Sequence, residues 1–301
     1  MVAMSFGAQV TLSDSGLQAM PDRERQGYDT GDPMMDRGKP VEMFLASTVG
    51  SAMFQAFCGA FFSHYCRLTV VGQNHLPRPP FIICSNHTSH IDSAVLMTAS
   101  GHPFSTLALL GASDYFFDSW RTRFLVSRFM NVIPIDRHAR HNSLRRSLAM
   151  CKEFLHKRHG NLILYPEGTR SPDGQMQTFK RGTGLFAVDL GVPVVPAHIE
   201  GAHTILAKGK FMPRPEPVAV HFGEPIMFES RQFAHLSGRG LRNAAVELLE
   251  ERIRFLRRGA ATRGVIRSPE EFEIGEHATI SISALAHRGR NTKSHGGRES
   301  E

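Results

Sequence analysis

Short apolar runs alternate with longer amphipathic segments along the middle of the chain. Several runs are bounded by Pro, Gly or Asn, which is typical of buried strands. We expect strands at Leu68–Val71, Phe81–Cys84, Thr106–Leu109, Val132–Ile135, Leu162–Tyr165, Pro193–Ala197 and Val218–Phe222. Apolar residues at helical spacing predict helices at Ile91–Ala99, Ser113–Met130, from Asn142 onward, and at Leu241–Leu256. This alternation predicts an α/β fold, with a largely parallel or mixed sheet flanked by helices.

The folded domain is expected to occupy residues 68–258, between two polar ends. Residues 1–40 have no sustained hydrophobic period, and residues 259–301 are rich in Gly, Arg and Ser. Both ends are predicted to be disordered tails, because they hold too few apolar side chains to form a core. The first of them also lacks the apolar run of a secretory signal.

An apolar segment, residues 41–67, precedes the domain. From residue 43 to 66 it carries no Asp, Glu, Lys or Arg, although Ser, Thr and Gln side chains and two glycines dilute it. The spacing of Phe54, Phe57 and Phe61 places three aromatic rings on one helical stripe. We therefore predict membrane-associated helices that lie in the bilayer interface. A single membrane span and a buried helix that covers the sheet are the alternatives.

The charge of the chain indicates its class of partner, and its cysteine content indicates the compartment of the active site. The 301-residue chain has 35 Lys and Arg against 28 Asp and Glu, a formal net charge of +7. Such a balance favours an anionic partner: a nucleic acid, an anionic bilayer surface or a phosphorylated substrate. The sequence carries no recognised nucleic-acid-binding motif, so we expect no nucleic acid. The four cysteines form no C-x-x-C pair, which indicates reduced thiols and an active site on the cytoplasmic side of the membrane.

Polar side chains crowd the loop between the strand that ends near Asn86 and the next helix. Functional residues of α/β folds concentrate in such strand-to-helix loops. His87 in the loop and Asp92 in the first helical turn can meet, so that Asp92 binds one imidazole nitrogen and leaves the other free as a base. There are two alternatives. Asp92 could simply stabilise the helix N-terminus, or His87, His90 and Asp92 could bind a metal ion, although no second His/Asp cluster is obvious downstream.

Further cations follow later strands. Arg137 follows a short predicted strand, and its guanidinium can form a planar fork to a phosphate or pair with the adjacent aspartate. The next strand leads into Glu167–Arg170, whose charged side chains indicate a polar site with Arg170 on an anion. Lys180 and Gly182 then open a helix, and helix N-termini bind anions. The sequence contains no G-x-S-x-G motif, so a serine nucleophile is not expected.

Together these blocks resemble the glycerolipid acyltransferase family, which includes the bacterial 1-acyl-glycerol-3-phosphate acyltransferases. The matching blocks, in the family's order, are Asn86-His87 through Asp92, Ile135-Asp136-Arg137, Pro166-Glu167-Gly168-Thr169-Arg170-Ser171 with Phe179-Lys180-Arg181-Gly182, and Val192-Pro193-Val194-Val195-Pro196. Four blocks in one order are far more specific than any one of them. The chain departs from the family's pattern where Tyr165 stands in place of a frequent Phe.

The resemblance implies transfer of an acyl group from acyl-CoA or acyl carrier protein to a lysophospholipid, with 1-acyl-sn-glycerol-3-phosphate as the favoured acceptor. His87 would be the general base, Asp92 its orienting partner, and Pro196 would shape the pocket near the acyl chain. The acceptor site would be formed by Asn86, Arg137, Glu167, Gly168, Thr169, Arg170, Lys180 and Gly182. The expected partners are the two substrates, the membrane surface and, as a further candidate, acyl carrier protein. We expect neither a metal ion nor another cofactor, because a thioester is already activated.

Three other functions fit parts of the sequence. The acceptor could be another lyso-lipid or a glycolipid, since the blocks do not specify it. A metal-dependent hydrolase would use His87, His90 and Asp92, and bound metal in the pure protein would identify it. A non-catalytic lipid-binding module would use the basic surface on anionic membranes, although the presence of both His87 and Asp92 argues against it.

Overall fold

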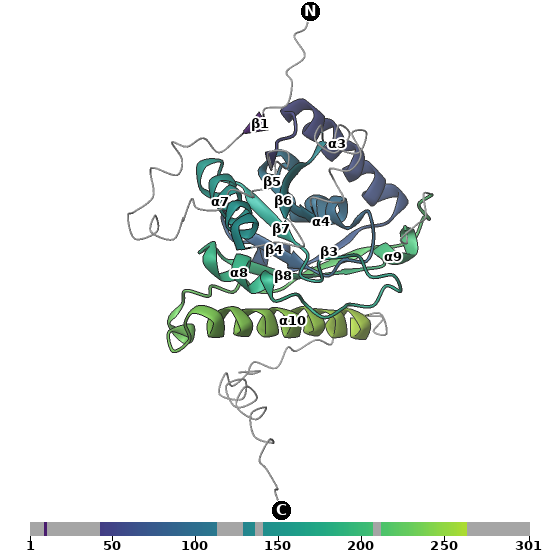
Figure 1. Ribbon diagram of the computed structural model, residues 1–301. Helices are drawn as coiled ribbons and strands as arrows, with labels where there is room; N and C mark the ends of the chain where they lie inside the picture. Colours follow the sequence, from purple (N-terminus) through teal and green to yellow (C-terminus); the bar gives the residue numbers. More distant parts are fainter. Residues whose placement is uncertain (1–8, 11–42, 113–128, 136–140, 207–211, 264–301) are drawn as a thin grey trace, which may run out of the picture. The chain divides into compact units, whose positions relative to one another are not determined.

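All seven strands predicted from the apolar runs are present in the computed structural model, which describes residues 9–10, 43–112, 129–135, 141–206 and 212–263 (Figure 1). They are β3 Thr69–Val71, β4 Ile82–Ser85, β5 Leu107–Ala112, β6 Asn131–Ile135, β7 Asn161–Leu164, β8 Val194–Glu200 and β9 Ala219–Phe222. Two strands of two residues each, β1 Gln9–Val10 and β2 Met43–Phe44, extend the sheet beside β6.

The α-helices are α3 Thr48–Ala60, α4 Asp92–Ser100, α7 His141–Lys157, α8 Gly182–Asp189, α9 Ala202–Ile205 and α10 Gly238–Arg263. The helices predicted at Ile91–Ala99, from Asn142 onward and at Leu241–Leu256 are present as α4, α7 and α10. Short 3-10 helices lie at Gln73–His75, Phe104–Thr106 and Arg231–Phe233. The helix predicted at Ser113–Met130 lies almost wholly outside the described residues. Helix α10 runs to Arg263 and so extends past the predicted end of the domain at residue 258.

The sheet is mixed, with the strand order β1-β2-β6-β5-β7-β4-β8-β9-β3. Its five central strands, β6, β5, β7, β4 and β8, run parallel to one another, whereas β2 is antiparallel to β6 and β9 is antiparallel to β8. Strand β3 closes the far edge parallel to β9. The predicted α/β class with a largely parallel or mixed sheet is therefore confirmed.

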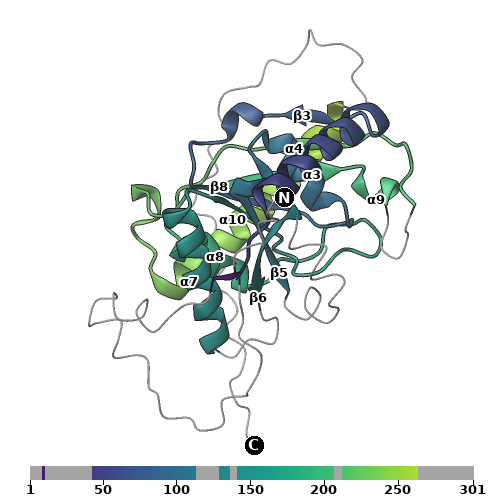
Figure 2. The same cartoon turned by 90° about the horizontal axis from the view of Figure 1, so that it is seen from above.

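Helices cover both faces of this sheet, which explains the continuous apolar runs of the central strands. In β4, Ile82 and Cys84 pack into a cluster with residues of α7, α8 and α10, while Ile83 packs on the opposite face with residues of α4. Figures 1 and 2 show α3 and α4 on one side of the sheet and α10 on the other. Every residue of β4 is buried. Because β4 also pairs with β7 on one side and with β8 on the other, the start of the segment that follows it is held in place.

The apolar segment at residues 41–67 is only partly helical. Met43–Phe44 pairs with β6 as strand β2, which corrects the helix predicted there. Helix α3 begins after Ser47, whose hydroxyl accepts a hydrogen bond from the N–H of Gly50 at 3.0 Å, and it continues into a π-helix at Phe61–Tyr65. Within the described residues, no helix has both the length and the apolar character needed to cross a bilayer.

The parallel central strands bring two predicted blocks together. In the register of β4 and β7, Cys84 lies opposite Leu164, so both strands end at the same edge of the sheet. The loops after them, which begin at Asn86 and Tyr165, are therefore neighbours. Ligands of open α/β sheets bind at this carboxyl edge.

Candidate active site

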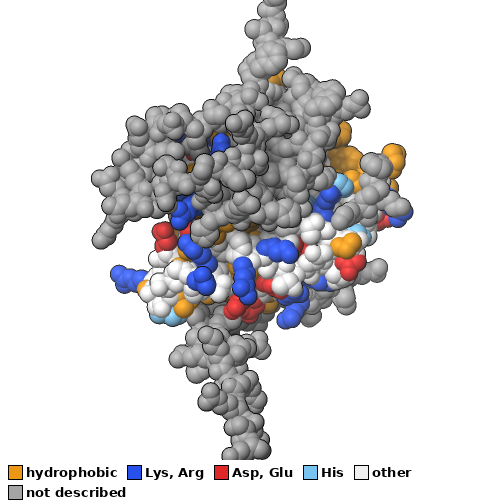
Figure 3. Space-filling view, in the orientation of Figure 1, with side chains coloured by type: hydrophobic (Ala, Val, Ile, Leu, Met, Phe, Trp, Pro, Cys, Tyr) orange, Lys and Arg blue, Asp and Glu red, His pale blue; other side chains and the backbone are white. Residues whose placement is uncertain are grey.

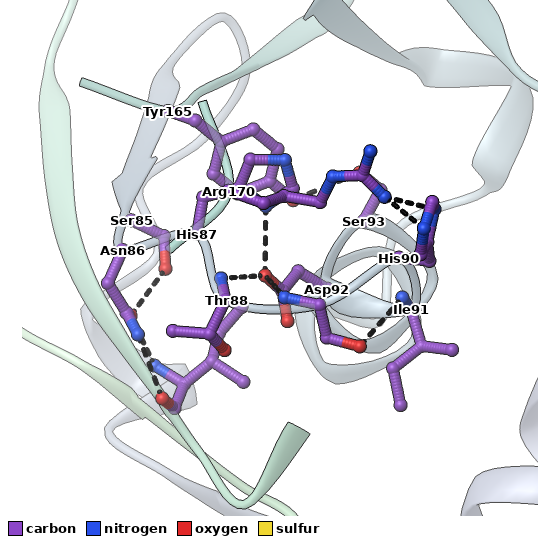
Figure 4. Close-up of polar contacts among 12 residues, drawn as sticks. Ser85, Asn86, His87, Thr88, His90, Ile91, Asp92, Ser93, Tyr165 and Arg170 are labelled. Carbon is purple, nitrogen blue, oxygen red and sulfur yellow. Dashed lines mark hydrogen bonds and ion pairs between the residues drawn. The ribbon is translucent and has the colours of Figure 1, made fainter. Parts of the chain in front are cut away.

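His87 and Asp92 meet at the start of α4, as the spacing predicted (Figure 4). Nδ1 of His87 lies 2.9 Å from Oδ2 of Asp92. The same oxygen accepts hydrogen bonds from the backbone N–H groups of Thr88, at 2.6 Å, and Ser89, at 2.8 Å. Asp92 is fully buried, and its negative charge stands in the first turn of the helix, where the helix dipole favours it.

This arrangement defines which nitrogen of His87 can act as a base. A carboxylate only accepts hydrogen bonds, so Nδ1 of His87 must carry the proton that it donates to Asp92. Nε2 then holds the free lone pair of the neutral ring. The His87 side chain keeps 19% of its surface exposed, in contrast to the 0% of Asp92, so a substrate hydroxyl can reach it.

Glu167 fastens the loop that carries His87. Its Oε1 accepts a hydrogen bond from the backbone N–H of His87 at 2.8 Å, and its Oε2 accepts one from Gln177 at 2.9 Å. Burial raises the pKa of Glu167 to about 7, although these two N–H bonds lower it. Both oxygens are thus directed at main-chain groups, so Glu167 positions the loop in this structure, whereas the sequence predicted a residue that lines the acceptor site.

The side chain of Asn86 also forms hydrogen bonds with main-chain groups. Its side-chain NH₂ donates to the carbonyl of Ile199 at 3.0 Å, and its Oδ1 accepts from the N–H of Ile199 at 2.8 Å. The residue is buried and joins the end of β4 to β8. Its amide is therefore bonded to the neighbouring strand, and its contact with substrate stays a prediction.

The predicted cations and glycines lie on the loops beside this pair. The guanidinium of Arg170 contacts the imidazole of His90 (Figure 4). Gly168 is exposed with φ +70°, and the side chain of Lys180 runs close to it. Gly182 begins α8, with open space beside its Cα.

The remaining predicted residues are less closely connected to His87. Thr169 is half-buried, in sequence between Gly168 and Arg170. Pro196 is buried within β8, and its ring lies beside Gly223. Arg137 lies outside the described residues.

The metal alternative relied on His90 as a third ligand. In the structure His90 contacts the cationic Arg170, which is an unfavourable neighbour for a bound cation. Among the residues that the structure describes, no group of three or more His, Cys, Asp or Glu side chains is placed to hold a metal ion.

The ring of His87 is covered by a residue for which the sequence suggested no role. Tyr165 directly follows β7, and its ring is stacked on the imidazole with centroids 3.9 Å apart and planes 13° from parallel. Its hydroxyl lies 3.0 Å from Oγ of Ser93. The sequence marked Tyr165 only as a departure from the family's pattern. Its place at the end of a strand parallel to β4 is the signal that could have identified it.

Replacing Glu167 with Gln should change how stability depends on pH. The pKa of about 7, against an ordinary value of 4.5, means that the native state binds this proton more tightly than the unfolded chain. The resulting stabilisation is complete below about pH 4.5 and is lost as the pH rises through 7. Between these limits the wild type should lose up to about 3 kcal/mol relative to Glu167→Gln.

Urea unfolding of both proteins from pH 4.5 to 8 measures this difference. The same substitution at the exposed Glu224 controls for the chemistry of the change. A gap between wild type and Glu167→Gln that stays constant over the range would contradict the raised pKa.

Comparison with known proteins identifies the domain that holds this site. Residues 67–200 match the family model described as Acyltransferase, and this range contains His87, Asp92, Tyr165 and Glu167. The 1-acyl-sn-glycerol-3-phosphate acyltransferase of Limnanthes alba is 27% identical over 159 residues, which cover 53% of this chain and 54% of the relative. The enzyme of the same name from Pseudomonas aeruginosa is 32% identical over 138 residues, covering 46% of this chain and 51% of the relative.

A solved structure is also similar: the 1-acyl-sn-glycerophosphate (LPA) acyltransferase PlsC from Thermotoga maritima, with a TM-score of 0.49 and 25% identity over 68% of this chain and 79% of that one. This chain spans about half the length of the curated relatives that it matches. The family model covers the residues of the His87–Asp92 pair. The segment at residues 67–200 of this chain belongs to the acyltransferase family.

Proposed function

We propose that this protein transfers an acyl group from acyl-CoA or acyl carrier protein to the free hydroxyl of 1-acyl-sn-glycerol-3-phosphate, giving phosphatidic acid. The observation that carries the proposal is the hydrogen-bonded His87–Asp92 pair within the matched acyltransferase domain. The relatives support this acceptor, because they are named 1-acyl-sn-glycerol-3-phosphate acyltransferases.

The chemistry requires a base rather than a metal-bound nucleophile. An alcohol is a weak nucleophile at neutral pH, whereas a neutral imidazole accepts a proton readily. Nε2 of His87 takes the hydroxyl proton as the acceptor oxygen attacks the thioester carbonyl carbon. The new C–O bond forms, the C–S bond breaks, and the imidazolium returns the proton to the departing thiolate. Asp92 orients the ring and stabilises its transient positive charge, as in other His–Asp pairs.

Three backbone N–H groups of the His87 loop are already engaged and are not free to act as oxyanion donors. The N–H groups of His87, Thr88 and Ser89 all bind carboxylates in this structure. A tetrahedral intermediate needs donors that point at its developing negative oxygen. The donors are therefore groups other than these three N–H groups.

Cations on the adjacent loops suit the acceptor phosphate. Arg170 and Lys180 flank the segment that Glu167 ties to the His87 loop through Gln177. The N–H of Lys180 donates to the carbonyl of Pro166 at 2.8 Å within this segment, and the N–H of Ser171 donates to the carbonyl of His87 at 2.8 Å, which joins the segment to the His87 loop. A guanidinium can bind a phosphate through two parallel hydrogen bonds, so we assign the phosphate contact to Arg170.

Helix α3 offers an apolar surface for the membrane. Val49, Met53 and Phe57 follow one another at intervals of four residues and are 71%, 67% and 62% exposed. Hydrophobic side chains gather on the side of the molecule where α3 lies (Figure 3). An uncharged helix face of this kind binds the bilayer interface. We therefore propose a membrane-associated protein whose active site faces the cytoplasm, in keeping with four free, buried cysteines.

Replacing His87 with Ala should lower the turnover number by about 10²–10⁴-fold, since positioned general-base catalysis contributes that much. The assay follows labelled acyl-CoA and 1-acyl-sn-glycerol-3-phosphate in detergent with EDTA. His235→Ala, which removes an exposed imidazole just before α10, is the matched control and should behave as wild type. Product from wild type alone supports metal-independent transfer through His87, and equal rates in His87→Ala would exclude His87 as the base.

Replacing Arg170 with Ala should raise KM for the phosphorylated acceptor by about 10- to 150-fold, because a charge-assisted hydrogen bond contributes about 1.5–3 kcal/mol. The turnover number should change little. A monoacylglycerol acceptor, which lacks the phosphate, provides the control, since its KM should be the same in both proteins. A KM effect of equal size on both acceptors would show that Arg170 does not bind the phosphate.

Replacing Phe57 with Ser should weaken binding to vesicles, because its exposed ring would no longer enter the interface. A fully buried aromatic side chain is worth about 1.5–3 kcal/mol, which sets an upper limit of about 10- to 150-fold on the loss. Flotation with vesicles that contain anionic lipid measures the bound fraction. Phe255→Ser, on α10 and 63% exposed in the native protein, is the matched control. Equal losses in the two variants would contradict a specific role for α3.

A further inference from the structure

The imidazole of His87 is held on its face as well as at its edge. Asp92 holds the Nδ1 edge through a 2.9 Å hydrogen bond. The face lies on the phenol ring of Tyr165, with centroids 3.9 Å apart and planes 13° from parallel (Figure 4). A single hydrogen bond leaves a ring free to tilt about the line that joins the two atoms. The stack removes that freedom.

The ring of Tyr165 is itself fixed by the helix that carries Asp92. Its hydroxyl lies 3.0 Å from Oγ of Ser93, the residue that follows Asp92 in the first turn of α4. Adjacent residues of one helical turn therefore define both constraints on the imidazole. Asp92 acts directly, and Ser93 acts through the phenol ring.

We propose that Tyr165 is a positioning residue, whose ring holds the imidazole of His87 in its reactive plane and whose hydroxyl fixes that ring through Ser93. The inference rests on the proposed function of His87 as the base, and it adds two residues for which the sequence suggested no role in the reaction.

The stack has a second consequence for the reaction. An aromatic face attracts a cation that lies within about 6 Å of its centroid. The imidazolium that forms when His87 accepts a proton lies well inside that distance. Burial, and after it the charge of Asp92, raise the pKa of the Tyr165 phenol well above its ordinary value of 10, so this ring stays neutral beside the base.

The kinetic test compares Tyr165→Leu, Tyr165→Phe and Ser93→Ala in the acyl-transfer assay. Tyr165→Leu removes the aromatic face and should lower kcat by about 10- to 100-fold, with KM for both substrates within about threefold. Tyr165→Phe keeps the face and should retain kcat within about fivefold of wild type, as should Ser93→Ala. Because the hydroxyls of Tyr165 and Ser93 bind each other, the double variant Tyr165→Phe, Ser93→Ala should lose no more kcat than either single variant.

Phe104→Leu is the matched control for lost packing, since Phe104 is fully buried in the core cluster that Tyr165 packs against. It should lower thermal stability while kcat stays unchanged. Loss of kcat in Tyr165→Phe equal to that in Tyr165→Leu would overturn the role of the ring face. Losses that multiply in the double variant would overturn the role of the Ser93 bond.

A readout that does not depend on turnover keeps this inference separate from the proposed function. Protons of a ring stacked on an aromatic face resonate upfield, and the His87 signals can be assigned by their loss in His87→Gln. They should be upfield in wild type and Tyr165→Phe, and should move downfield in Tyr165→Leu. Unchanged signals in Tyr165→Leu would refute the stack. Upfield signals in a wild type that transfers no acyl group would refute the proposed function alone.

Discussion

The buried carboxylate of Asp92 is the group on which the site depends. A charge in the interior is unfavourable unless hydrogen bonds compensate it, and here one oxygen accepts three of them. Two come from the backbone of Thr88 and Ser89, so the charge can be accommodated only when the loop has its observed conformation. The third orients the imidazole of His87. The loop shape, the start of α4 and the direction of the base are therefore consequences of a single ionised group.

The polar side chains around the His87–Asp92 pair mainly form hydrogen bonds with main-chain groups. Glu167 binds the N–H of His87 and ties the loop after β7 to the loop after β4, and Asn86 joins the same loop to β8. If either side chain were lost, buried main-chain groups would be left without a hydrogen-bond partner. This lowers stability more than the loss of a solvent-exposed hydrogen bond, whose groups can bind water instead. Polar residues of such a block can thus be important through the main chain that they hold, because that main chain sets the geometry of the His87 imidazole.

The sequence predicted the strands and the His87–Asp92 contact because both leave local signals. Central strands buried on both faces are continuous apolar runs, and a loop followed by a helical turn brings residues five apart together. The support by Glu167 and the stack of Tyr165 depend on β7 lying beside β4, which no local pattern encodes. The strand at Met43–Phe44 was missed for a related reason, since a two-residue pairing is too short for periodicity. Helix α10 extends beyond its predicted end at Leu256, because its last residues are more charged than apolar and therefore continue no hydrophobic pattern.

Helix α3 connects the proposed membrane surface to the chemistry. Its exposed face carries Phe57, while its other face packs on the layer that contains α4. There the ring centroids of Phe54 and Phe104 lie 5.8 Å apart. Gln55 accepts a hydrogen bond from the N–H of Phe104 at 3.1 Å in the same contact. If α3 rests in the interface, the helix that begins with Asp92 is the next layer from the lipid. A lysophospholipid could then present its hydroxyl to His87 without leaving the bilayer surface, which would explain why an uncharged helix precedes the catalytic domain.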